Sequence, residues 1–177
     1  MARQRLPLTL AACAACLLGP VAAASACDDT SSPPTRATLA RARAATLCLI
    51  NAARAKRGLD RLGTTTSLTR AASAHSRDMA AHDFFSHDSP GGSTPKQRIA
   101  GAGYLDGATS WSIGETIAWG SGSMASPASI VRSWLQSPGH REILLDGRYD
   151  DVGIGIALGS PVGGDGATFT GDFGERG

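Results

Sequence analysis

Residues 134–141 read WLQSPGHR, the most distinctive stretch of this chain. Its first half closes an apolar pattern of helical period, which predicts a helix from about residue 127 to Gln136. The Ser-Pro-Gly that follows is typical of a turn that ends a helix. The stretch therefore places His140 just past the end of a helix.

Two further segments hold ionisable side chains in unusual surroundings. Residues 84–91, FFSHDSPG, put His87 in a loop after a helix that we expect from Ser67 to about Phe84. Residues 113–118, IGETIA, place the carboxylate of Glu115 inside an apolar run. Burying a carboxylate without a partner is costly, so we expect Glu115 to have one.

The last third of the chain changes from a helical period to a period of two. Residues 152–157 and 167–173 both alternate in this way and are separated by turn-forming residues 161–166, which predicts a β-hairpin. Helices are expected earlier, from about residue 39 to 53 and from residue 95 to 99. Helices first and strands late predict an α+β fold with a small antiparallel sheet packed against helices.

The N-terminus has the three parts of a secretory signal: a basic start, an apolar run over residues 6–21 and small residues at 24–26. The run is shorter than the roughly 20 residues of a membrane span. We therefore expect residues 1–26 to be a cleaved signal peptide, 27–35 a polar lead-in and 36–177 a single domain. No later segment is apolar enough to form an integral membrane span.

The charge balance excludes some partners. Two of the 17 Lys and Arg lie in residues 1–26 and none of the 15 Asp and Glu does, so the remaining chain is formally neutral. A neutral domain lacks the excess of positive charge with which proteins bind nucleic acid or an anionic membrane.

Cys27 and Cys48 are the cysteines left after the expected cleavage. In an exported domain two cysteines most simply form one disulfide. Closing a loop of about 20 residues would stabilise the fold by roughly 3 kcal/mol in the chain-entropy model. The alternative is a lipid on Cys27, although Ala24 is not the leucine typical of lipoprotein signals at that position.

In this order and spacing, the three segments resemble the CAP superfamily of cysteine-rich secretory proteins, antigen 5 and pathogenesis-related 1 proteins, and especially its short bacterial members. The resemblance covers roughly residues 45–174. Its further shared pieces are Thr94-Pro95 with Arg98, Gly103-Tyr104, Val152-Gly153-Ile154-Gly155 and Phe173-Gly174. It implies an α-β-α sandwich with a cleft lined by two histidines and two acids, of which His87, Glu115 and His140 match three by position.

The chain departs from that pattern at two places. Ser137, a possible neighbour of the cleft, stands where eukaryotic members have the second glutamate, and Thr116 stands where asparagine is usual. Both departures weaken the inheritance of a metal-dependent activity. His87, Glu115 and His140 could hold a divalent cation such as zinc, could transfer protons, or could form a polar network that only holds the fold together.

His75 and His82 share one stripe of the helix expected at 67–84, so we expect them to be core histidines. Ser137 is not expected to be a nucleophile, because Ser-Pro-Gly at the end of a helix is typical of a turn.

The sequence as a whole predicts a secreted protein, extracellular or periplasmic depending on the cell envelope. We expect a binding or structural module for a divalent metal or a small apolar ligand, since the resemblance allows lipid or sterol binding. The alternatives are a metal-dependent hydrolase or peptidase, which is less favoured, and a cell-surface module that binds an extracellular protein.

Overall fold

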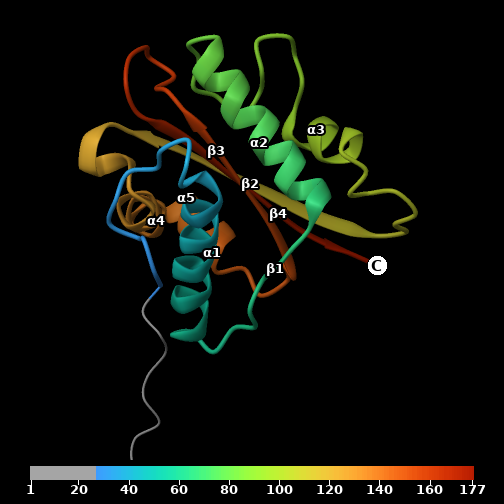
Figure 1. Ribbon diagram of the computed structural model, residues 1–177. Coiled ribbons are helices and arrows are strands. Elements are labelled where there is room, and N and C mark those ends of the chain that lie inside the picture. The colour runs from blue at the N-terminus through green and yellow to red at the C-terminus, as the bar shows by residue number, and fades with distance from the viewer. Residues whose placement is uncertain (1–26) are drawn as a thin grey trace, which may run out of the picture.

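The computed structural model describes residues 27–177 (Figure 1), and the expected signal at residues 1–26 lies outside them. One four-stranded sheet, in the order β1-β3-β4-β2, lies between two layers of helices. The elements are α1 (Leu39–Ala55), β1 (Gly63–Thr64), α2 (Thr66–Ala81), α3 (Pro95–Gly101), β2 (Trp111–Gly120), the 3₁₀ turn η1 (Gly122–Ala125), α4 (Pro127–Gln136), α5 (Pro138–Leu144), β3 (Asp151–Leu158) and β4 (Ala167–Arg176).

The sheet is mixed rather than wholly antiparallel. β4 pairs antiparallel with both β2 and β3, which confirms the predicted hairpin at the end of the chain. The short strand β1 pairs parallel with β3 through Gly63 and Thr64. Two residues are too few to leave a periodic pattern, so this strand has no signal in the sequence. The predicted α+β sandwich is confirmed. It differs from the prediction in this parallel pair and in β2, where the sequence analysis named no strand.

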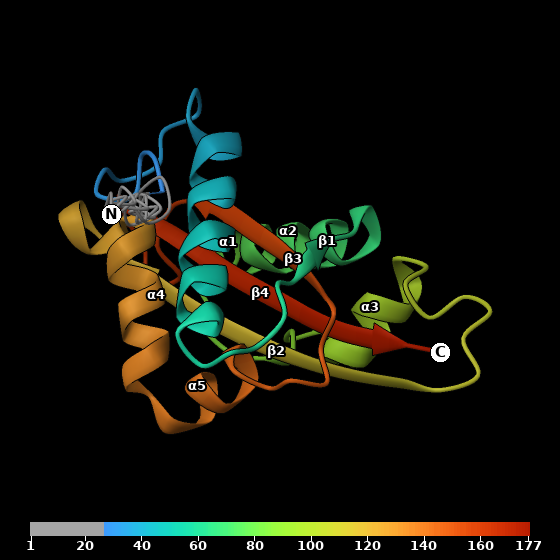
Figure 2. The same cartoon turned by 90° about the horizontal axis from the view of Figure 1, so that it is seen from below.

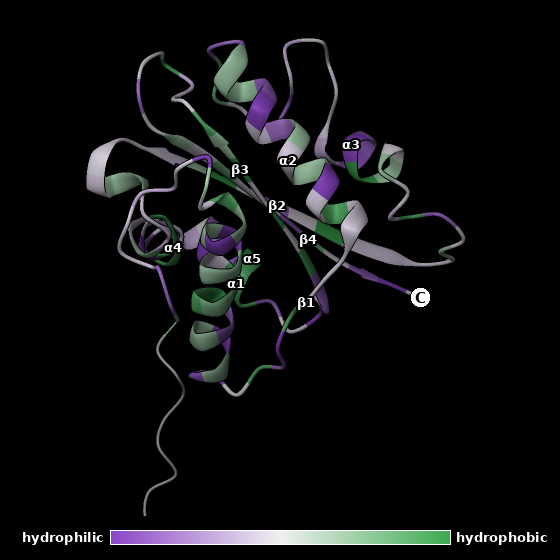
Figure 3. Cartoon of the chain, viewed as in Figure 1, coloured by the Kyte–Doolittle hydropathy of each residue, from purple (hydrophilic) through white to green (hydrophobic). Residues whose placement is uncertain are grey.

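The larger core lies between the sheet and the layer formed by α1, α4 and α5 (Figure 2). Alternate side chains of β3 and β4, including Ile154, Ile156 and Phe169, project into it. Trp134 of α4 is almost fully buried there, and its indole Nε1 donates to the carbonyl of Ile117 at 3.1 Å. This layer therefore seals one face of the sheet. Across the two layers, hydrophilic bands alternate with hydrophobic ones along the helices (Figure 3).

α2 packs on the opposite face, with α3 beside it, and approaches the sheet very closely. A Cβ atom added to Gly153 would overlap the backbone of Leu68, and one added to Gly155 would overlap the backbone of Ala72. The glycines of β3 thus allow the axis of α2 to come closer to the strands than any side chain would permit.

α2 differs at both ends from the predicted 67–84 helix. Thr65, not Ser67, caps its start by accepting a hydrogen bond from the Leu68 amide. The helix ends at Ala81, because the backbone of Asp83 lies in the left-handed region, at a φ of 51°. His82 consequently leaves the buried stripe on which it was expected, and its side chain is 68% exposed.

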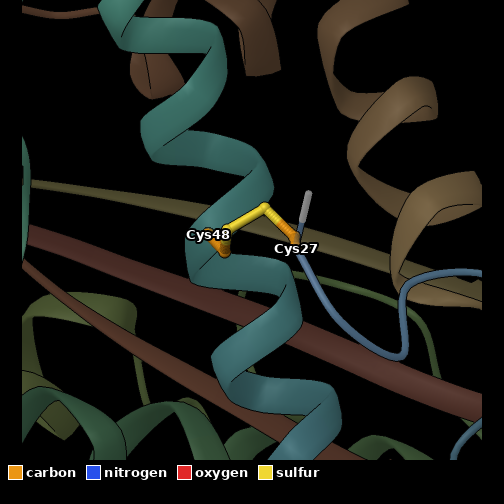
Figure 4. Close-up of a disulfide and its surroundings, with 2 residues drawn as sticks. All are labelled: Cys27 and Cys48. Atoms are coloured by element: carbon orange, nitrogen blue, oxygen red, sulfur yellow. A yellow bond between two sulfur atoms is a disulfide. The ribbon is translucent and has the colours of Figure 1, made fainter. Parts of the chain in front are cut away.

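The expected disulfide between Cys27 and Cys48 is present (Figure 4). It ties the beginning of the described chain to the middle of α1 across a sequence separation of 21 residues. A sulfur in this bond is no longer a thiol, which removes the lipid alternative for Cys27. No helix within residues 27–177 combines the length and the apolar character needed to cross a membrane.

We predict that Gly155→Ala destabilises the protein by about 3 kcal/mol, because α2 must move away from β3 to accommodate the new methyl group. Urea unfolding followed by circular dichroism measures this change. Gly91→Ala is the matched control, since its added methyl meets no atom within 4 Å and its φ is not positive. Equal stabilities of the two variants would contradict the close packing of α2.

Candidate functional site

Glu115 lies in the middle of β2, the strand at one edge of the sheet. Its side chain is only 2% exposed and faces the α2 layer. The sequence placed this carboxylate in an apolar run and predicted a partner for it. The structure provides two partners, both from the segment that joins α2 to β2.

His87 and Arg98 bind the two oxygens of Glu115 separately. His87 Nδ1 lies 2.8 Å from Oε1, and the Arg98 guanidinium donates to Oε2 at 2.6 Å. Arg98 also donates to the carbonyl of His87 at 2.8 Å and to that of Ser93 at 2.7 Å. One buried carboxylate therefore holds both the loop after α2 and the helix α3 against β2.

These contacts decide the charge of Glu115. Burial acts to raise its pKa, but the hydrogen bond with His87 and the positive charge of Arg98 outweigh it and hold the pKa below its ordinary value. Glu115 is therefore an anion at neutral pH, with both oxygens already engaged.

Asp172 is a site residue that the sequence analysis missed. It lies directly across from Glu115 in the β2–β4 register and is fully buried. Burial, followed by the negative charge of Glu115, raises the pKa of Asp172 well above its ordinary value of 3.8. As a carboxylate it would have no hydrogen-bond donor among residues 27–177, but once protonated it can itself donate to Glu115. In the sequence, the position of Asp172 within the alternating run at 167–173 was the only feature that could have drawn attention to it.

His75 is buried on α2, as expected, but it also borders this site. Its Nε2 donates to the carbonyl of Ser86 at 2.9 Å and lies 3.9 Å from Oε1 of Glu115. Burial lowers the pKa of His75 even though Glu115 acts to raise it. A neutral His75 therefore supports the loop that presents His87.

His140 does not follow the helices in a loop, as expected, but lies in the short helix α5, which begins at Pro138 directly after α4. Burial and then the positive charge of His87 lower the pKa of His140. The hydroxyl of Ser137 makes no hydrogen bond to another described residue. Of the expected cleft residues, His87 and Glu115 are hydrogen-bonded to each other, and the helix that contains His140 contacts β2. Ser137 lies at the boundary between α4 and α5.

Within residues 27–177 there is no cluster of three or more His, Cys, Asp and Glu side chains arranged to hold a metal. Glu115, the expected third ligand, is engaged by Arg98 instead.

The comparison with known families agrees with this geometry. The model of the cysteine-rich secretory protein family, CAP, matches residues 47–173. The chain belongs to the CAP family. The matched segment runs from α1 through β4 and includes every residue of the site described above.

Two curated CAP relatives come from Bacillus subtilis (strain 168). The uncharacterized protein YkwD is 33% identical over 107 residues, which cover 60% of this chain and 39% of YkwD. The uncharacterized membrane protein YlbC is 36% identical over 110 residues, which cover 62% of this chain and 30% of YlbC. The chain therefore matches well under half of the length of either relative.

Solved structures of CAP domains have the same fold. An extracellular protein containing an SCP domain from Bacillus anthracis aligns with a TM-score of 0.63 at 26% identity, over 81% of this chain and 44% of that one. An outer surface protein from Borrelia burgdorferi aligns with a TM-score of 0.61 at 24% identity, over 74% of this chain and 90% of that one. The second likeness concerns the fold alone.

We predict that Asp172→Asn stabilises the protein relative to the parent increasingly as pH rises from 4 to 8. The parent carboxyl has a raised pKa in the folded state, so the stability it contributes is complete below pH 3.8 and is lost as pH rises toward the folded pKa. The asparagine amide does not titrate and can still donate to Glu115. Urea unfolding at several pH values measures the difference. Parallel stability curves would show that Asp172 ionises normally in the fold.

Proposed function

We propose that this protein is an exported binding module whose His87 and His140 imidazoles hold a divalent cation, for which zinc is well suited. The observation that carries the proposal is the 2.8 Å hydrogen bond between His87 Nδ1 and the buried Glu115 carboxylate. Export is supported by the signal-like N-terminus, by the Cys27–Cys48 disulfide and by the extracellular description of the Bacillus anthracis structural relative.

The bond to Glu115 prepares His87 as a ligand. A carboxylate that accepts from one ring nitrogen fixes the tautomer and leaves the other nitrogen with a free lone pair. Here Nδ1 is the nitrogen that donates, so Nε2 is left for a ligand. The His87 side chain is 49% exposed, which gives a cation in solution access to it.

His140 supplies the second imidazole. Because its pKa is lowered, this ring is neutral at neutral pH and one of its two nitrogens has a free lone pair for a metal. Zinc supplies positive charge and Lewis acidity when it is bound at such nitrogens.

Two imidazoles fit an exchangeable cation rather than a permanent structural zinc, which normally has four protein ligands. Water or a partner molecule would complete the coordination. The two engaged oxygens of Glu115 disfavour the hydrolase alternative, because neither is free to take a proton from water. The proposal is therefore binding without catalysis.

Isothermal titration calorimetry with zinc chloride tests this proposal on the purified protein at pH 7.5. We expect saturable one-site binding that His87→Ala and His140→Ala each abolish while both variants stay folded. His82→Ala is the matched control, because His82 is an exposed helix-end histidine paired with Asp78 at 2.8 Å and lies outside the site. Binding that survives both site substitutions, or that His82→Ala removes, would refute the proposal.

A second candidate ligand, a small apolar molecule, is supported by a groove between α1 and α4 of about 590 Å³. Its apolar lining includes Leu49, Ala53, Val131 and Leu135. Pockets of this size and character are typical of small-molecule sites.

We predict that a fluorescent fatty acid binds the parent protein several-fold more tightly than Ala53→Gln, because the longer polar side chain fills this groove. Ala44→Gln, on an exposed position of the same helix, should bind like the parent. Fluorescence titration gives the affinities. Identical affinities of all three proteins would exclude this groove as the ligand site.

A further inference from the structure

The outer edge of β3 is only partly covered by another strand. β1 pairs with Asp151 and Val152 and then ends, so the remaining residues of β3 have no strand on that side within residues 27–177. Open strand edges present rows of unpaired N–H and C=O groups that another extended chain can join. This edge is separate from the polar site, which lies at the β2 edge.

The register identifies the backbone groups that face this edge. The amide of Gly159 donates to Gly166 at 2.8 Å, so in an antiparallel ladder the odd-numbered residues of β3 bond to β4 and the even-numbered ones point outward. The amide of Gly63 in β1 donates to the carbonyl of Asp150 at 2.8 Å, which agrees with this parity. Ile154, Ile156 and Leu158 therefore direct their backbone groups to this edge, where Ile154 and Ile156 are buried and Leu158 is exposed.

A groove of about 520 Å³ lies at the end of β3, between α1 and α2. Residues 156–158 line it from the strand, and Leu39, Ala80 and Ala81 line it from the helices. Leu158 is 42% exposed although it belongs to the sheet. The groove thus combines apolar walls with strand backbone that faces its interior.

Three arginines surround the groove: Arg36, Arg43 and Arg77. No carboxylate lines it, and none of the three guanidinium groups forms a salt bridge or a hydrogen bond with another described residue. Arg43 Nε is moreover shielded from solvent without a hydrogen-bond acceptor in residues 27–177. A buried donor of this kind calls for an acceptor that comes from outside.

We propose that this groove binds an extended, acidic peptide segment of a partner protein, which pairs with the exposed end of β3 at Leu158. The strand backbone supplies the hydrogen bonds and the arginines select carboxylate side chains, the combination by which edge-strand sites gain affinity and specificity. The groove volume accommodates about three residues. A second copy of this chain is disfavoured as the occupant, because its own edge would bring three more arginines to the same place.

Calorimetry with the synthetic, blocked peptide Glu-Val-Glu-Val-Glu-Val tests the proposal on the purified protein. We expect saturable binding of this peptide and none of its Lys-Val counterpart. The double variant Arg43→Gln, Arg77→Gln should bind about tenfold more weakly or worse, because two charge-assisted contacts are lost. The double variant Arg41→Gln, Arg57→Gln removes the same charge outside the groove and should bind like the parent.

Two N-methylated peptides distinguish strand addition from simple charge attraction. One carries N-methyl groups on its valines and the other on its glutamates, so each loses the N–H groups of one strand edge. We expect one of them to bind like the unmodified peptide and the other to lose binding. Equal binding of both, no binding of the acidic peptide, or an undiminished affinity of the Arg43 and Arg77 variant would each overturn the proposal.

Discussion

The negative charge of Glu115, buried in the middle of an edge strand, is the constraint around which one side of this molecule is built. An unpaired buried carboxylate costs several kcal/mol, so the fold must bring a cation to it. Arg98 fulfils this role because α3 holds it in place through the capping box of Thr94 and Gln97. The same guanidinium binds the carbonyls of His87 and Ser93, so neutralising the charge also fixes the loop that presents His87.

The close packing of α2 controls the electrostatics of the site as well as its shape. Gly153 and Gly155 let the helix approach the sheet so closely that Asp172 is cut off from water. In that environment a second charge beside Glu115 is unfavourable, and the raised pKa of Asp172 follows from the packing. Two glycines in β3 thereby determine the ionisation state of a carboxyl group in the neighbouring strand.

The sequence predicted those parts of the fold whose pattern is local. The hairpin of β3 and β4 and the disulfide were predictable because alternation and cysteine number are read directly from the chain. The pairing of Glu115 with Asp172 was not, because it depends on the β2–β4 register across more than fifty residues of sequence. Arg98 was recognised only as a piece of a shared motif, since nothing in its neighbourhood shows which carboxylate it binds. The prediction that His82 is a core residue was wrong for a local reason. Asp83, the next residue, has a left-handed backbone, so the helix ends before His82 can continue its buried face.

The two edges of the sheet, at β2 and at β3, differ in what lies beside them. At the β2 edge the indole of Trp134 satisfies the carbonyl of Ile117, and the loop containing His87 covers the strand. The β3 edge has no further strand beyond β1 among the described residues, and its exposed end at Leu158 lies beside three arginines. Positive side chains beside a strand edge repel an identical edge and attract an acidic one, so these arginines would both disfavour pairing with a second copy and favour an acidic partner. Because α1 and α2 fix the walls of the groove, an incoming strand would meet a site that is already formed, and little of its binding free energy would be spent on rearrangement.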